Sequence, residues 1–98
     1  MKTIKLPGHK YANCCIREYR KKDGDAGDFD ILQSYNTDVL AFDYETGWID
    51  CVCLYSRTTI KHISWYARLK NTSYYSIKRC VTDRKRYNRY TGEYADRL

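Results

Sequence analysis

The chain has 98 residues, of which 43% are apolar, and it carries a formal net charge of +6. This length fits a single domain spanning residues 1–98, because two separate cores would need a longer chain, and the apolar fraction excludes wholesale disorder. No segment approaches the roughly 20 apolar residues of a membrane span, and the first residues lack the apolar core of a signal peptide. We therefore expect a cytoplasmic protein without membrane contact, whose five cysteines are free thiols.

The first half of the chain predicts β-structure. Residues 37–44 and 48–55 are rich in β-branched, aromatic and aliphatic side chains, with the alternation typical of strands. The turn signal at residues 45–47 between them predicts an antiparallel hairpin. A Gly- and Asp-rich turn is expected at residues 21–28. The candidate strands cover residues 2–6, 12–20, 29–34, 37–44 and 48–55, and a short helix is the alternative for residues 12–20.

From residue 56 the apolar spacing changes to that of a helix. Ser56 is a suitable N-cap, and the apolar residues that follow predict a helix from about residue 57 to 70. A second helix is expected from residue 73 to near 86, while residues 87–98 fit either a continued helix or a small hairpin turning at Gly92. The prediction is an α+β fold, with an antiparallel sheet of about four strands and two helices packed on one face.

The residue types that carry chemistry in enzymes form no recognisable constellation. Cys51 and Cys53 would share one face of a strand, but the C-x₂₋₄-C ligand pairs of a structural zinc site are missing. His62 has no evident acidic partner, and there is no glycine-rich phosphate loop. We therefore expect no metal, no cofactor and no catalytic residue, so that the protein is not an enzyme.

Charge is distributed unevenly along the chain. Residues 31–56 hold four acidic and no basic side chains, whereas residues 57–98 hold eleven basic and three acidic ones. Cations bind phosphates and tyrosine rings stack on unpaired bases, but Arg and Tyr are also favoured at protein interfaces. A solvated helix face explains the same pattern. The candidate partner-binding residues are Lys78, Arg79, Arg84, Lys85, Arg86, Tyr87, Arg89 and Tyr90.

The start of the first predicted helix is a second candidate surface. Ser56, Arg57, Thr58 and Thr59 combine hydroxyl groups, a cation and free backbone N–H groups, which together could hold an anion. Helix capping explains the same residues more simply, and we favour it.

Two segments resemble a known small domain. Residues 32–39 and 55–66, with Gly47 between them, match the pattern SYxTxV … G … YSxTTxKHIxxF, with Tyr66 at the usual aromatic position. The pattern is similar to an uncharacterised domain of short proteins encoded by phages and mobile elements, mostly of Gram-positive bacteria. The match covers about residues 31–80, and no catalytic residues are attached to that domain.

This resemblance implies a counter-defence role, because short phage proteins of this type are often host-takeover factors and include anti-CRISPR proteins. The implied partner is a host protein or ribonucleoprotein in the bacterial cytoplasm, such as a type II CRISPR effector nuclease, inhibited by steric blockade through the basic Tyr/Arg-rich surface. The net positive charge argues against simple DNA mimicry. The alternative is a free-standing nucleic-acid-binding accessory protein. The sequence does not indicate an oligomeric state.

Overall fold

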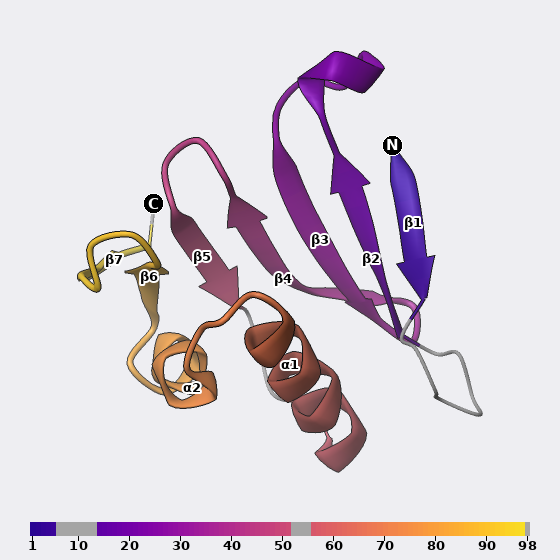
Figure 1. The fold of residues 1–98 in the computed structure, drawn as a ribbon. Coiled ribbons are helices and arrows are strands. Elements are labelled where there is room, and N and C mark those ends of the chain that lie inside the picture. Colours follow the sequence, from indigo (N-terminus) through magenta and orange to yellow (C-terminus); the bar gives the residue numbers. More distant parts are fainter. Residues whose placement is uncertain (6–13, 52–55, 98) are drawn as a thin grey trace.

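The computed structural model describes residues 1–5, 14–51 and 56–97, and the seven strands in these ranges form one antiparallel sheet (Figure 1). The strands lie side by side in sequence order, so the sheet is a meander. The prediction of about four strands is therefore wrong. The strands are β1 (Lys2–Lys5), β2 (Cys14–Tyr19), β3 (Phe29–Ser34), β4 (Thr37–Asp43), β5 (Trp48–Cys51), β6 (Lys85–Asn88) and β7 (Tyr94–Asp96), with a short 3₁₀ helix η1 (Lys21–Asp23) between β2 and β3.

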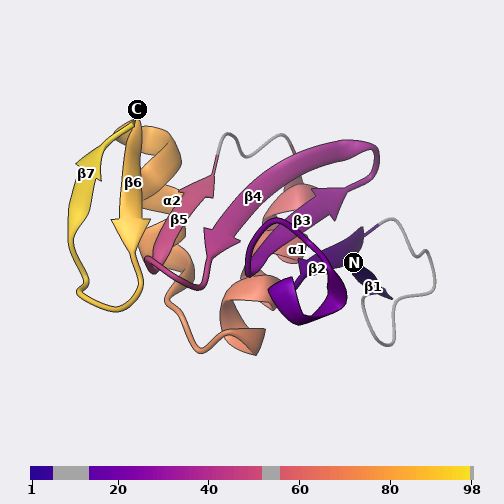
Figure 2. The ribbon, with the colours of Figure 1, turned by 90° about the horizontal axis from the view of Figure 1, so that it is seen from above.

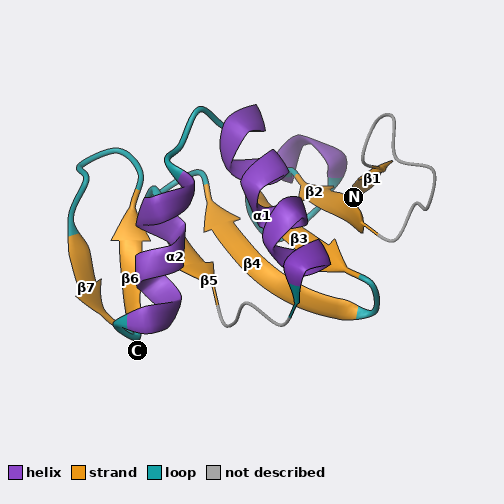
Figure 3. Cartoon of the chain, turned by 90° about the horizontal axis from the view of Figure 1, so that it is seen from below, coloured by secondary structure: helices purple, strands orange, loops and turns teal. Residues whose placement is uncertain are grey.

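Both α-helices lie in the connection between β5 and β6, which are themselves antiparallel neighbours. They are α1 (Arg57–Leu69) and α2 (Tyr74–Thr82). Viewed from above, the sheet lies in front of both helices, and viewed from below, both helices lie in front of the sheet (Figures 2 and 3). The helices therefore cover one face of the sheet and leave the other face without a second layer among the described residues.

Strand alternation and register place the core between the sheet and the helices. Ile16, Leu32, Leu40 and Cys51 are paired across β2, β3, β4 and β5, and all four are buried. The register between β3 and β4 shifts next to Leu32, and the extra residue, Val39, is buried as well. Helix α1 contributes Ile63, Tyr66 and Ala67 to the same core, and α2 contributes Ile77 and Cys80.

The second helix is shorter than its expected extent of residues 73 to about 86. It ends at Thr82, and Arg84 has a φ of 55°, in the left-handed region that terminates a helix. The chain then forms the β6–β7 hairpin, in which Tyr87 pairs with Tyr94 and their ring centroids lie 5.1 Å apart. The hairpin alternative for residues 87–98 is therefore confirmed, and these two extra strands account for much of the error in the strand count.

The remaining element predictions are confirmed within small shifts at their ends. The strands expected at residues 29–34 and 37–44 and the helix expected at 57–70 are β3, β4 and α1. Parts of the three other expected strands, residue 6, residues 12–13 and residues 52–55, lie outside the described residues. Neither described helix has the length and apolarity needed to cross a membrane.

Candidate functional site

The helical segment carries the whole net charge of the protein. Residues 57–84 contain seven Lys/Arg side chains and one acidic side chain, whereas the rest of the chain contains eleven of each kind. The net charge of +6 is therefore that of the segment that forms α1, α2 and their connection. The sheet and its turns are neutral as a whole.

Helix α1 presents a straight cationic stripe to solvent. Arg57, Lys61 and Arg68 are exposed and occupy positions i, i+4 and i+11 of the helix, which lie on one side of it. The buried positions, centred on Ile63 and Tyr66, lie on the opposite side. Within the described ranges none of the three cations has an acidic partner, so their charges are directed only at solvent.

The second helix and the residues after it carry two more cations of this kind. Lys78 and Arg84 are exposed and have no acidic partner in the described part of the chain. Arg79 instead pairs with Asp83, with 2.8 Å between its Nε and the carboxylate. We call the five exposed cations Arg57, Lys61, Arg68, Lys78 and Arg84 the basic helix layer. The first four lie on α1 and α2, which Figure 3 shows in front of the sheet, and Arg84 follows α2.

The predicted binding residues beyond Arg84 instead contact other side chains or the backbone of the protein, although they remain partly or largely exposed. Lys85 forms an ion pair with Asp96. The guanidinium of Arg86 lies 4.8 Å from the ring centroid of Trp48 and its Nε lies 3.5 Å from Asp50. Sequence analysis assigned these cations to a basic tail because their acidic partners, Asp96 and Asp50, are not adjacent to them in the chain.

The other predicted residues of this tail also have internal contacts. Arg89 lies over the ring of Phe42, 5.3 Å from its centroid. The hydroxyl of Tyr90 donates to the carbonyl of Tyr44 at 2.6 Å, although more than half of the Tyr90 side chain is exposed. Tyr87 packs on its hairpin partner as described above. Of the eight predicted residues, the structure therefore brings only Lys78 and Arg84 into the basic helix layer.

The hydroxyl group of Ser56 caps the start of α1. Ser56 Oγ accepts a hydrogen bond from the Thr59 N–H at 3.2 Å, as an N-cap does. Thr59 itself is buried, while Arg57 belongs to the basic helix layer. The cap expected at Ser56 is confirmed, while an anion site at Ser56, Arg57, Thr58 and Thr59 stays a prediction.

Three residues of the two segments that carry the sequence resemblance meet in the interior. Ser34, at the end of β3, lies 2.8 Å from Nδ1 of His62 and 3.2 Å from Oγ1 of Thr59, both on α1. All three side chains are at most 2% exposed. A serine beside a histidine is part of many nucleophilic sites, but here a reactant would have no access. We assign this network to joining α1 to the sheet.

A second interior cluster, which the sequence analysis missed, surrounds Asp30. This carboxylate is completely buried and accepts hydrogen bonds from the hydroxyls of Tyr44 at 2.6 Å and Tyr66 at 2.8 Å. Arg20 lies 3.3 Å and Lys70 3.4 Å from its oxygens. Two donors and two cations thus satisfy the carboxylate, which joins β3 to the end of β4 and to the C-terminal end of α1.

The pKa values around Asp30 follow from this arrangement. Burial, together with the charge of Asp30 and its hydrogen bond, raises the pKa of the Tyr66 hydroxyl. Burial and the same carboxylate also raise the pKa of Tyr44. Burial alone would lower the pKa of Lys70, but its hydrogen bond to Tyr44 and its attraction to Asp30 outweigh this and raise it. The two phenols and the lysine are therefore all held protonated.

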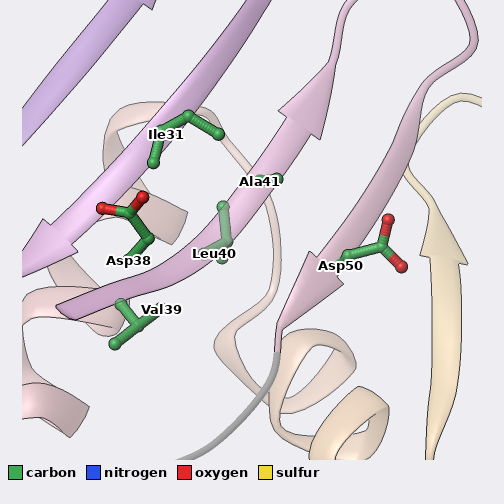
Figure 4. A pocket seen from close by; sticks show the side chains of 6 residues that line it. All are labelled: Ile31, Asp38, Val39, Leu40, Ala41 and Asp50. Carbon is green, nitrogen blue, oxygen red and sulfur yellow. The ribbon is translucent and has the colours of Figure 1, made fainter.

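The uncovered sheet face contains a shallow hollow of about 100 Å³ (Figure 4). Asp38 and Asp50 stand on either side of it, with Ala41 between them. Each carboxylate is paired with an arginine of the same face, Asp38 with Arg17 at 2.8 Å and Asp50 with Arg86. The volume is below the roughly 300–1,000 Å³ typical of small-molecule sites. The lining residues are Ile31, Asp38, Val39, Leu40, Ala41 and Asp50.

The described residues contain no group of three or more His, Cys, Asp or Glu side chains that could hold a metal ion. Cys53, which the sequence analysis considered as a ligand, lies outside the described residues.

The fold and the surface together define a small α+β protein with a seven-stranded meander and a cationic helical layer on one face. Over residues 2–84 the chain matches a family of unknown function, DUF8033, and it belongs to that family. No curated protein and no solved structure matches the chain.

Proposed function

We propose that this protein is a non-enzymatic binding protein of the bacterial cytoplasm whose basic helix layer contacts the phosphates of a nucleic acid, either free or within a nucleoprotein. One observation carries the proposal. The five cations of the layer are exposed, have no acidic partner among the described residues, and all lie on the two helices or directly after α2. Lys85 and Arg86, by contrast, are neutralised by carboxylates, and the other exposed cations without an acidic partner in the described residues lie on β1 and η1. Unpaired surface cations that displace counterions from phosphates supply most sequence-independent affinity for nucleic acids.

The geometry of α1 supports the same conclusion. Arg57 and Lys61 are one helical turn apart, which corresponds to about 6 Å along the axis at 1.5 Å per residue. Arg68 continues the stripe about 10 Å further, by the same rise per residue. The helix therefore holds these three cations in a line, so that they can contact successive phosphates along a nucleic-acid backbone.

A narrower form of the proposal identifies the partner as a defence nucleoprotein of a phage host, such as a type II CRISPR effector, blocked sterically. This form rests on the sequence resemblance. Co-purification with an effector, with and without its guide RNA, tests it, and the absence of association in both states would exclude it.

The general proposal is tested by the salt dependence of oligonucleotide binding. We expect log Kd to rise steeply with log salt, because each phosphate contact contributes a slope of about 0.7 to 0.9. The variant Lys61→Gln/Arg68→Gln/Lys78→Gln should reduce that slope by about 2 to 3. Fluorescence anisotropy at several salt concentrations measures both quantities.

A control variant separates local contacts from net charge. Lys2, Lys5 and Lys22 are also exposed, but they lie on β1 and η1, away from the helices (Figure 1). The variant Lys2→Gln/Lys5→Gln/Lys22→Gln loses the same three charges and should retain most of the slope. A salt-independent affinity, or an equal effect of the two triple variants, would refute the proposal.

A further inference from the structure

Tyr75 is the most exposed large apolar side chain of the described residues, at 77%. It is the second residue of α2 and lies on the solvent side of that helix, since Ile77 and Cys80 on the opposite side are completely buried. Its neighbour Tyr74 packs against the core, and the two rings meet edge to face with centroids 5.7 Å apart. The Tyr75 ring is therefore supported from one side and otherwise open to solvent.

The Tyr75 ring lies next to a cation of the basic helix layer, and this combination indicates which kind of ligand the ring would bind. Lys78 lies three residues further along α2, so its ammonium group and the Tyr75 ring are neighbours on the helix surface. Aromatic rings that accompany cations on a surface are the elements with which proteins bind unpaired nucleotides, because the ring stacks on a base while the cation holds a phosphate.

We infer that the basic helix layer selects single-stranded nucleic acid, with Tyr75 stacking on an unpaired base and Lys78 contacting an adjoining phosphate. This inference rests on the proposed function and names its ligand class. In a duplex the faces of the bases are occupied by their neighbours, so a ring on a helix surface has no base face to cover. The cations of the layer would still contact duplex phosphates, but Tyr75 would add nothing.

The test compares binding of a fluorescein-labelled oligo(dT) or oligo(U) with binding of a hairpin duplex that has the same number of phosphates. Wild-type protein should bind the single strands more tightly at the same salt concentration. The variant Tyr75→Leu should weaken single-strand binding about tenfold, the effect of losing one stacked base, and leave duplex binding within about twofold. The variant Tyr75→Phe keeps the ring and should resemble the wild type.

The outcomes separate this inference from the proposed function. If wild-type protein binds neither single strands nor duplex, both are overturned. If it binds nucleic acid with a steep salt dependence but prefers duplex, or if Tyr75→Leu changes nothing or weakens both ligands equally, only the single-strand inference is overturned. Far-UV circular dichroism of the two Tyr75 variants checks that α2 is retained.

Discussion

Replacing Asp30 with alanine removes a single carboxylate that several elements share. The substitution leaves the cations Arg20 and Lys70 without their common counter-charge and leaves the hydroxyls of Tyr44 and Tyr66 without an acceptor. Because Asp30 is completely buried, water cannot take its place without entering the core. The loss should therefore appear as a fall in the free energy of unfolding.

The size of this fall in the free energy of unfolding follows from the contacts of Asp30. Breaking a buried ion pair by removing one partner costs about 3–5 kcal/mol. The side chains of Arg20 and Lys70 are 23% and 19% exposed and can turn toward water, so we expect the lower end, about 3 kcal/mol. For a domain of this size that corresponds to a fall in Tm of roughly 12–24 °C. The variant Tyr66→Phe removes one hydrogen bond to a charged group and should cost about 1.5 kcal/mol.

Urea unfolding followed by far-UV circular dichroism measures these values. Asp38→Ala is the matched control, since Asp38 also pairs with an arginine but is 53% exposed, and its loss should cost less than about 1 kcal/mol. If Asp30→Ala cost no more than Asp38→Ala, the carboxylate would not hold α1 on the sheet, and our reading of the cluster would be refuted.

Three further predictions concern backbone, cap and thiol. Gly47 has a φ of +87°, and a Cβ at this position would lie 2.5 Å from a tyrosine ring, so Gly47→Ala should destabilise the protein by more than about 2 kcal/mol. Gly24 has a similar φ of +88° but open space around it, so Gly24→Ala should cost only about 1 kcal/mol. Ser56→Ala should cost about 1 kcal/mol and Ser73→Ala much less, because Ser73 makes no capping hydrogen bond through its side chain. Burial raises the pKa of the Cys14 thiol from 9.0 to about 12, so in the native protein it should not react with a disulfide reagent at pH 8. Between pH 9 and 12 the Cys14 thiol loses its proton in the unfolded chain but keeps it in the native state. The free energy of unfolding should therefore fall as the pH rises through this range, by up to about 1.4 kcal/mol per pH unit from this thiol.

Urea midpoints of the four variants test the first two predictions, and equal losses within either pair would contradict them. Thiol counting before and after unfolding, with peptide mapping of the labelled cysteines, tests the third. Rapid labelling of Cys14 in the folded protein would contradict it. Stability that did not fall above pH 9 would contradict the linkage argument.

Local patterns in the sequence predicted the strands of the central hairpin and the first helix, because each depends on side chains close together in the chain. Thr37 to Tyr44 is rich in β-branched, aromatic and aliphatic side chains, as a strand is, and Ser56 caps the first helix. The end of the chain was harder to predict. Tyr87, Tyr90 and Tyr94 are spaced as on a helix, yet Tyr87 and Tyr94 face each other across a hairpin. The left-handed backbone at Arg84, after the end of α2, and at Gly92, between β6 and β7, is what distinguishes the hairpin from a continued helix.

The surface was harder to predict than the fold, because charge pairing is a property of tertiary structure. Arg86 and Asp50 are far apart in the chain and become neighbours only when β6 pairs with β5. The Asp30 cluster did leave one local signal that the sequence analysis did not use. Within β3, Asp30 alternates in phase with Leu32, so a carboxylate was to be expected on the apolar face of the sheet.

The meander order of the strands has a consequence for how the protein reaches this fold. Neighbouring strands are consecutive in the chain, so most of the sheet can form by closing short loops, which favours fast folding. The pairing of β5 with β6 is the exception, since both helices lie between them. Until those helices have been synthesised and have docked, five strands would present a bare apolar face, and this is the stage at which the nascent chain is most vulnerable to aggregation.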